Sequence, residues 1–336
     1  MNSIIDRIAC DLSLDRIYIK SIIQRSAFYY KRFTIPKQNG DQRVIYQASP
    51  ELKSLQYWVR EKILKLLPIS EAAFAYQTGS SIKKHADFHK NAYFIFHTDI
   101  KNYFPSIHEE MLTNILIEHR DSLQTQGMWF EDICDVVAKI CFRNGQLSIG
   151  TVSSPIISNI VAYKFDELVI SYCKKQGYLY SRYADDIYIS GNSYIPESTE
   201  EFIKKCLCSY GFRMNISKTW FKSKKSRRKI TGLIITDTGQ VSVGMETRKK
   251  IKGMIYQCLV NGNGSPSKIL GYLAYLKDVE PQTYNKFIIK YSTYCNGDVI
   301  SVIRHSAQKS VAEVPPSDPS PDSNPSSTGV SLTVRV

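Results

Sequence analysis

Two adjacent acidic residues between two strand-forming runs constrain this chain more than any other feature. Asp185 and Asp186 lie in the segment YSRYADDIYISG, residues 180–191, where Tyr and Ile flank them on both sides. Aromatic and β-branched residues favour strands, so the segment predicts a β-hairpin with the acids at or beside its tight connection. Successive side chains of a strand point to opposite faces, so neighbouring carboxylates converge only at a turn. Such a pair is either ordinary turn chemistry or a site for a hard divalent cation such as Mg²⁺.

The charge balance indicates a polyanionic partner. The 336 residues include 44 Lys and Arg against 31 Asp and Glu, a formal net charge of +13. This excess favours nucleic acid as the first candidate and an anionic membrane surface as the second. No apolar run approaches the roughly 20 residues that a membrane helix needs, and the N-terminus has no cleavage-site pattern, so we expect a cytoplasmic protein without membrane association. The eight cysteines are scattered and match no zinc spacing, so we expect reduced thiols.

Hydrophobic spacing and turn residues predict helices that alternate with short hairpins. In chain order, the expected elements are one or two helices within 1–30, a hairpin over 33–47 that turns at Asn39-Gly40, a helix that begins at Ser49-Pro50, a strand that ends near Asp99, two helices within 109–143, a helix over 155–176, the acidic hairpin, a helix over 197–210, and a hairpin over 230–243. From Glu246 to about Tyr294 the pattern predicts a separate helical unit. The Pro- and Ser-rich segment 311–336 is expected to be disordered.

A third carboxylate completes a layout that is typical of palm-type polymerases. Asp99 follows a predicted buried strand, helices come next, and the hairpin with Asp185 and Asp186 follows them. In such polymerases, carboxylates on neighbouring strands hold two metal ions, of which one activates the attacking hydroxyl and the other stabilises the leaving oxygens. We therefore expect an α+β fold of the right-hand polymerase type, in which an antiparallel palm sheet carries the acidic hairpin. The expected parts are N-terminal helices and fingers in 1–98, the palm in 99–243 with fingers helices inserted at about 109–150, and a helical thumb in 244–310.

Five short motifs in order resemble those of reverse transcriptases. They are DIKNYFPSI at 99–107, SSPIISNI at 153–160, YADD at 183–186, NISKTW at 215–220 and KITGLIIT at 229–236. Each motif is weak alone, but their order and spacing together identify the chain as a member of that family over roughly residues 15–305.

Two elements narrow the resemblance to bacterial retron reverse transcriptases. Retron enzymes carry a Val-Thr-Gly triplet at the primer-grip strand, and this chain has ITG at 230–232. They also carry an Asn-Ala-x-x-His element before the first catalytic Asp, and this chain has HADFH at 85–89, so His85 replaces the Asn. Two other departures are Ile149, where relatives have Gln, and Asn102, where many have Asp.

The resemblance implies a catalytic centre for nucleotidyl transfer. It implies that Asp99, Asp185 and Asp186, together with Ile100, hold the metal, and that Lys218 protonates the leaving pyrophosphate. The implied cofactor is a pair of Mg²⁺ ions, with Mn²⁺ as a substitute. The reaction would be attack of a hydroxyl on the α-phosphate of a deoxynucleoside triphosphate, catalysed by positioning and charge neutralisation. Lys218 could equally be a plain surface charge.

The resemblance also implies residues that bind nucleotide and RNA. Phe104 would lie under the sugar and exclude a 2′-hydroxyl, although an aromatic residue is often simply part of the core. A basic run can also be only a solvated face, a lone His is more often structural, and a Ser-Pro pair can simply begin a helix. The implied nucleotide-binding residues are Arg43, Phe104, Ser154, Pro155 and Asn159. The implied RNA- and primer-binding residues are His89, Lys222, Lys224, Lys225, Arg227, Arg228, Lys229, Ile230, Thr231 and Gly232.

A retron enzyme would copy part of a cognate folded non-coding RNA from an internal guanosine 2′-hydroxyl. The product would be branched multicopy single-stranded DNA (msDNA), joined 2′ to 5′ to the RNA. The resemblance further implies a role in antiphage defence with an effector protein encoded nearby. Two alternatives stay open: another bacterial reverse transcriptase lineage primed by a DNA 3′-hydroxyl, and an RNA- and DNA-binding scaffold that restrains a toxic effector.

Overall fold

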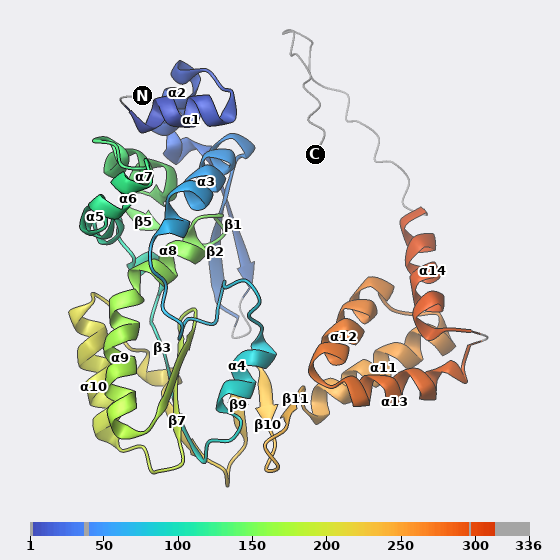
Figure 1. Cartoon of the computed structure of the whole chain (residues 1–336). Coiled ribbons are helices and arrows are strands. Elements are labelled where there is room, and N and C mark those ends of the chain that lie inside the picture. The colour runs from blue at the N-terminus through green and yellow to red at the C-terminus, as the bar shows by residue number, and fades with distance from the viewer. Residues whose placement is uncertain (1–2, 37–39, 296, 313–336) are drawn as a thin grey trace. The chain divides into compact units, whose positions relative to one another are not determined.

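An antiparallel sheet of four strands carries the acidic hairpin (Figure 1). The computed structural model describes residues 3–36, 40–295 and 297–312. Its contacts divide the chain into two units, Met1–Gly244 and Met245–Val336. In the first unit the strand order is β6-β7-β3-β8. These strands are, in the same order, Leu179–Tyr183, Asp186–Gly191, Phe94–Asp99 and Trp220–Ser223.

The register of β3 and β7 gives the sheet an apolar face and an aromatic, polar face. Phe96 pairs with Ile189, and both are fully buried in the main hydrophobic cluster. His97 pairs with Tyr188 on one side and with Trp220 on the other, and its ring centroid is 4.6 Å and 4.9 Å from theirs. Alternate residues of a strand share a face, so Asp99 at the end of β3 lies on the face of His97.

Helices cover both faces of the sheet. In Figure 1, α9 (Tyr163–Gln176) and α10 (Glu197–Ser209) run along one side of the strands, and α4 (Ile82–His89) lies on the other side. Buried residues from most helices of this unit join the sheet in one hydrophobic cluster. The other helices of the unit are α1 (Ile4–Leu12), α2 (Arg16–Gln24), α3 (Pro50–Lys62), α5 (Glu109–Glu118), α6 (Arg120–Thr125), α7 (Ile133–Cys141) and α8 (Ser154–Val161), with short 3-10 turns at Ser26–Tyr29, Leu64–Leu66, Phe104–Ser106 and Ile216–Lys218.

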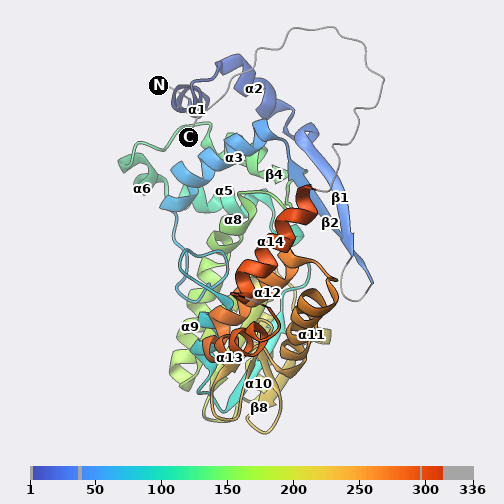
Figure 2. The ribbon, with the colours of Figure 1, turned by 90° about the vertical axis from the view of Figure 1, so that its right-hand side faces the viewer.

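An exposed hairpin precedes α3. Its strands β1 (Tyr30–Pro36) and β2 (Gln42–Ala48) pair antiparallel and extend away from the helices (Figure 2). The predicted hairpin is therefore confirmed, while Asn39 of its predicted turn lies outside the described residues. The predicted start of α3 is also confirmed, because the Ser49 hydroxyl caps the helix and Pro50 is its first residue.

Three expectations about helices and hairpins were too coarse. The predicted helix over 155–176 is two helices, because the chain bends at the buried residue Ala162, where ψ is −3°. The region 109–143 holds three helices, α5, α6 and α7, instead of two. The predicted hairpin over 230–243 has a third strand, because Thr231 and Gly232, with φ of 43° and 90°, form a tight turn. The short strands are β4 (Phe142–Arg143), β5 (Gln146–Leu147), β9 (Arg228–Ile230), β10 (Leu233–Ile235) and β11 (Val241–Ser242).

The second unit is helical, as the sequence predicts. Its helices bury an apolar core of their own, which includes Ile251, Leu273 and Phe287. Val311 and Ala312 end the last helix, so these two residues of the predicted disordered tail are helical, and 313–336 lie outside the described residues. The helices are α11 (Met245–Asn261), α12 (Pro266–Val279), α13 (Pro281–Ser292) and α14 (Val299–Ala312). Across the described parts of both units, each helix is too short or too polar to span a bilayer.

Candidate active site

The three predicted carboxylates meet at one end of the sheet. Asp99 ends β3, Asp186 begins β7, and the two are direct partners in the register of these strands. Asp185 lies in the two-residue connection between β6 and β7, so the predicted hairpin is confirmed. The N–H of Ile100 donates to the carbonyl oxygen of Asp185 at 2.9 Å, which ties the turn to the end of β3. Like charges directly across a sheet are destabilising, so this arrangement favours a bound cation.

The pKa of Asp185 shows the repulsion among the three neighbouring carboxylates. Burial, then the charges of Asp186 and Asp99, raise the pKa of Asp185 to about 7. Asp99 is itself buried, and its two carboxylate oxygens accept from Asn215 Nδ2 at 2.8 Å and from Lys218 Nζ at 2.7 Å. The site therefore concentrates negative charge that neighbouring polar groups offset only in part.

The ammonium group of Lys218 lies against the Asp99 carboxylate and partly neutralises its charge. Burial alone would lower the pKa of this lysine, but its hydrogen bond to Asp99 and the charges of Asp99, Asp185 and Asp186 raise it. The ammonium therefore stays protonated beside the carboxylates and has a proton to give. Of the residues predicted from the sequence to act in catalysis, Asp99, Asp185, Asp186 and Lys218 are all brought together.

The donor chemistry of the cluster fits a hard divalent cation. Carboxylate oxygens are the ligands that Mg²⁺ prefers, and Ile100, whose side chain is buried, could contribute only its carbonyl oxygen. Within residues 3–36, 40–295 and 297–312, no group of three His, Cys, Asp or Glu side chains is already placed to hold a metal ion. Two of the carboxylate oxygens that a metal would bind already have partners. Lys218 Nζ bonds a carboxylate oxygen of Asp99, and His97 Nε2 lies 2.9 Å from Asp186 Oδ1.

The predicted nucleotide-binding residues differ in exposure. Arg43 is exposed on β2, and Phe104 is partly buried. Ser154 and Asn159 are interior residues of α8: the Ser154 hydroxyl donates to the Ser148 carbonyl oxygen at 2.7 Å. Their side chains therefore shape the wall of the site and do not line its surface. Pro155 is in the first turn of α8, as a helix start predicts.

Tyr76 is a candidate site residue that no sequence motif marks. Its ring packs edge-on against Phe104, with centroids 6.4 Å apart, and its φ is 63°. Burial raises the pKa of Tyr76, and the charge of Asp185 adds to the rise while that of Arg43 opposes it. Tyr76 therefore packs against a predicted nucleotide-binding residue, Phe104, and is near enough to Asp185 to feel its charge.

Three of the predicted RNA- and primer-binding side chains, those of His89, Arg228 and Ile230, are inside the protein, which corrects their predicted contact with RNA. His89 is fully buried, and Arg228 is 1% exposed. Arg228 donates to the carbonyl oxygens of Ala92 and Thr236, so it fastens β9 to its surroundings. Ile230 is also buried, so it can offer RNA only main-chain atoms. Lys222 is partly exposed, and the exposed members of the predicted set are Lys224, Lys225, Arg227, Lys229 and Gly232.

A pocket of about 450 Å³ opens between the aromatic face of the sheet and the turn from β9 to β10. Its aromatic walls would suit stacking of a base, and its lysines would suit a phosphate. It brings the predicted primer-grip residues Thr231 and Gly232 into one pocket with the predicted catalytic residue Asp186. Other lining residues are His97, Tyr188, Trp220, Lys222 and Lys229.

His85 and His89 join α4 to the catalytic hairpin from within. The Ser181 hydroxyl lies 2.6 Å from Nε2 of each ring, and His89 Nδ1 is 2.7 Å from the Ser190 hydroxyl. One hydroxyl between two rings donates to one and accepts from the other, which suits neutral imidazoles. Burial lowers the pKa of His85 to about 3 and that of His89 well below its usual value. These residues hold the strands of the hairpin and are not placed to touch RNA.

The buried histidines predict a pH-dependent stability. The folded rings stay neutral, whereas the unfolded rings take up protons below the ordinary pKa of 6.5. Stability from this source is complete above that pKa and falls as the pH drops, by up to about 1.4 kcal/mol per pH unit for each ring. Urea unfolding at about pH 7.5 and about pH 5.5 should give a steeper loss for the wild type than for His85→Gln/His89→Gln. Equal losses would contradict the neutral, buried state of the rings.

The comparisons with known proteins agree with this geometry. The sequence matches the family described as Reverse transcriptase (RNA-dependent DNA polymerase) over residues 35–235. It is 29% identical over 273 residues to Retron Ec86 reverse transcriptase of Escherichia coli, across 80% of this chain and 82% of that protein. It is 30% identical over 288 residues to Retron Ec73 reverse transcriptase of the same species, across 81% and 90%.

A solved structure shares the fold. The apo telomerase from Candida tropicalis aligns with a TM-score of 0.50 and 11% identity, over 85% of this chain and 62% of that chain. At that identity the likeness supports only the α+β polymerase architecture, which the sequence predicted. The match to the family across most of the first unit, together with the retron relatives, is decisive. The chain belongs to the reverse transcriptase family, and within it to the retron reverse transcriptases.

Proposed function

We propose that this RNA-directed DNA polymerase copies part of a cognate structured non-coding RNA, and starts from an internal guanosine 2′-hydroxyl of that RNA. The product would be msDNA, a single-stranded DNA joined 2′ to 5′ to RNA. The register of the sheet is the observation that most directly supports polymerase chemistry. It pairs Asp99 with Asp186 and leaves Asp185 in the adjoining turn. The retron relatives support the choice of template and primer.

The residues of this chain act mainly by position and charge. Asp99, Asp185 and Asp186 would hold the cation pair, and Lys218, which bonds Asp99 in the metal-free protein, would give its proton to the leaving pyrophosphate. Two Mg²⁺ ions, or Mn²⁺ in their place, would activate the attacking hydroxyl and stabilise the leaving oxygens. Purified protein with its RNA and deoxynucleotides should make DNA when Mg²⁺ is added and none with a chelator. DNA synthesis that continues with the chelator would contradict the metal mechanism.

The template and primer would use the basic edge of the sheet. The exposed cations Lys224, Lys225, Arg227 and Lys229 lie on the connection from β8 to β9 and on β9 itself, and Lys229 lines the pocket beside Asp186. Structured RNA is bound mostly through backbone and shape, which suits such a cluster. Partner effector proteins and a role in antiphage defence belong to the same proposal, and the resemblance to retron enzymes is what supports them.

Phe104 is proposed as the gate that rejects ribonucleotides. Its ring is in the turn after β3 and packs against Tyr76 and Tyr103. Phe104→Ala should lower the preference for dCTP over CTP, measured as the ratio of kcat/KM, by at least about tenfold, because a steric filter of this kind contributes 1–3 kcal/mol. Phe28→Ala is the control, since that ring is 87% exposed. An unchanged preference in Phe104→Ala would remove the gate assignment.

A further inference from the structure

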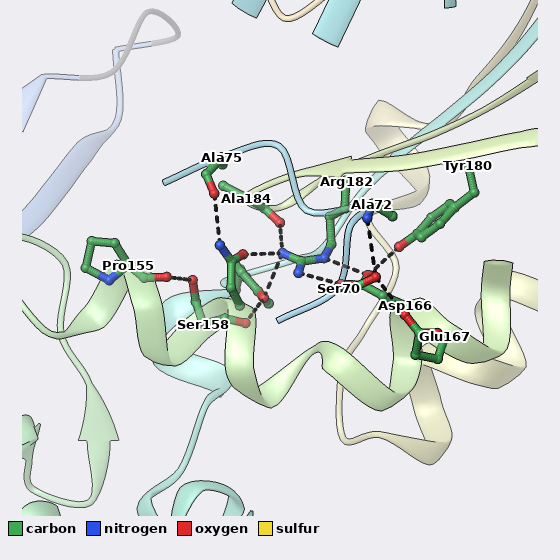
Figure 3. A network of polar contacts seen from close by, with 12 residues as sticks. Ser70, Ala72, Ala75, Pro155, Ser158, Asp166, Glu167, Tyr180, Arg182 and Ala184 are labelled. Atoms are coloured by element: carbon green, nitrogen blue, oxygen red, sulfur yellow. Dashed lines mark hydrogen bonds and ion pairs between the residues drawn. The ribbon is translucent and has the colours of Figure 1, made fainter. Parts of the chain in front are cut away.

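Arg182 is buried two residues before the turn Ala184-Asp185 and is bound by Asp166 (Figure 3). Its Nε donates to Asp166 Oδ1 at 2.9 Å and its Nη2 to Oδ2 at 2.7 Å, and neither side chain is exposed. The Tyr180 hydroxyl also donates to Oδ1, at 2.6 Å. Asp166 belongs to α9 and Arg182 to β6. Two parallel hydrogen bonds to a carboxylate fix the plane of a guanidinium.

The remaining nitrogen of the guanidinium lies among three oxygens from three other segments. Arg182 Nη1 is 3.0 Å from the carbonyl oxygen of Ala184, 3.2 Å from Asn159 Oδ1 and 3.2 Å from the Tyr103 hydroxyl oxygen. Ala184 belongs to the catalytic turn, Asn159 to α8, and Tyr103 to the segment of the proposed sugar gate. Figure 3 shows the side chain reaching from β6 into the space between the turn and α8.

The catalytic turn needs support of this kind. Ala184 has a φ of 56°, a left-handed conformation that a residue with a Cβ rarely adopts. The bond from Arg182 holds the carbonyl of this residue, and Asp185 follows directly. A different orientation of that peptide would shift Asp185 against Asp99.

The same network reaches the other walls of the nucleotide site. Asn159 Nδ2 donates to the carbonyl oxygen of Ala75 at 2.9 Å, and Ala75 is the residue before Tyr76. The Tyr103 hydroxyl donates to the carbonyl oxygen of Ser158 at 2.6 Å. Asn159 and Tyr103 are therefore themselves held in place, so a movement of the guanidinium would disturb α8, the segment of Tyr103 and the turn at Ala184.

We propose that Arg182, oriented by Asp166, is a positioning residue that sets the catalytic turn against the walls of the nucleotide pocket. This inference rests on the proposed polymerase function. The plain alternative is that the pair only stabilises the fold. A buried ion pair can often be replaced by apolar residues of similar size without loss of stability, so the two roles can be separated.

The test is the paired replacement Asp166→Leu/Arg182→Met. It removes both charges and keeps apolar volume, so the protein should fold, as circular dichroism and thermal melting would report. Single-nucleotide incorporation should show kcat reduced by about 100-fold, since small misplacements of reacting groups cost that much. The KM for the nucleotide should change less, and half-saturation by Mg²⁺ should need a higher concentration. A folded paired variant with wild-type kcat would overturn the inference.

Arg182→Lys keeps the positive charge against Asp166 and is the second variant if the pair fails to fold. Lysine lacks the planar fork and cannot bond the carboxylate and the turn together, so kcat should fall by at least about tenfold. A kcat within twofold of wild type would again overturn the positioning role. Tyr172→Phe is the matched control, because it removes a partly buried hydroxyl of α9 that lies 3.1 Å from Thr199 Oγ1, outside the network of Arg182, and should leave kcat nearly unchanged.

Wild-type protein and Asp185→Asn run in the same assay separate the two levels of the proposal. DNA from the wild type and none from Asp185→Asn supports the polymerase function, whatever the Arg182 variants do. Wild-type protein that makes no DNA would contradict the proposed function and the positioning role that rests on it.

Discussion

Asp185→Asn protein should fold and bind RNA normally, yet extend a primer at least about 1,000-fold more slowly than the wild type. Asparagine keeps the size of the side chain but removes a charge that the cation pair needs. The turn itself should persist, because the main chain of this residue accepts a bond from Ile100. Single-nucleotide incorporation with saturating Mg²⁺ measures the effect. Incorporation at the wild-type rate would show that Asp185 is turn chemistry only.

The melting temperature of Asp185→Asn protein tests the crowding of charge at the turn independently of activity. In the metal-free protein the pKa of Asp185 is raised to about 7 from its ordinary 3.8, first by burial and then by Asp186 and Asp99. The unfolded carboxyl therefore ionises first, and the wild type loses stability as the pH rises between these values. Asp185→Asn should melt at a higher temperature than the wild type above about pH 7 and at a similar temperature in acid. A lower melting temperature at alkaline pH would contradict the crowding of charge at the turn.

Asp166→Ala should destabilise the protein by about 3–5 kcal/mol, because it leaves the guanidinium of Arg182 buried without its counter-charge. Both side chains of this pair are fully buried, so solvent cannot compensate. Urea unfolding measures the change. Glu118→Ala is the control: Glu118 pairs with Lys164 at 2.7 Å on the surface, where solvent screens the charges. If both substitutions lowered the free energy of unfolding equally, the prediction that breaking the buried pair costs more than breaking a surface pair would be contradicted.

The acidic cluster was predictable because short motifs in a recognisable order mark it. An Asp pair between strand-forming runs needs a turn, and the polymerase-like order of elements predicts Asp99 beside that turn, as the register shows. Lys218 followed from the motif that carries it, and it reaches Asp99. Helix starts such as Ser49-Pro50 were equally local. Where a few neighbouring residues determine the outcome, the sequence is sufficient.

The residues that were missed or misjudged depend on packing between distant segments. Arg228 stands in a run of lysines and arginines, and only the fold shows that it points inward to Ala92. His89 resembles a surface ligand in the sequence but is enclosed by Ser181 and Ser190. Arg182 adjoins the catalytic motif, yet its partner in α9 lies 16 residues earlier in the chain. Burial and partnership of this kind arise from tertiary contacts, which periodicity and motif spacing do not encode.

The most direct measurement of self-primed DNA synthesis is the nucleic acid that co-purifies with the protein expressed from its own locus with flanking sequence. After RNase treatment, the sample is run on a denaturing gel with and without a 2′,5′-debranching enzyme, beside Asp185→Asn/Asp186→Asn protein. We expect a discrete small DNA that is absent from the variant and that debranching shifts. DNA that ignores debranching would contradict the 2′-hydroxyl primer, and bound RNA without any DNA would contradict the polymerase function and favour a scaffold.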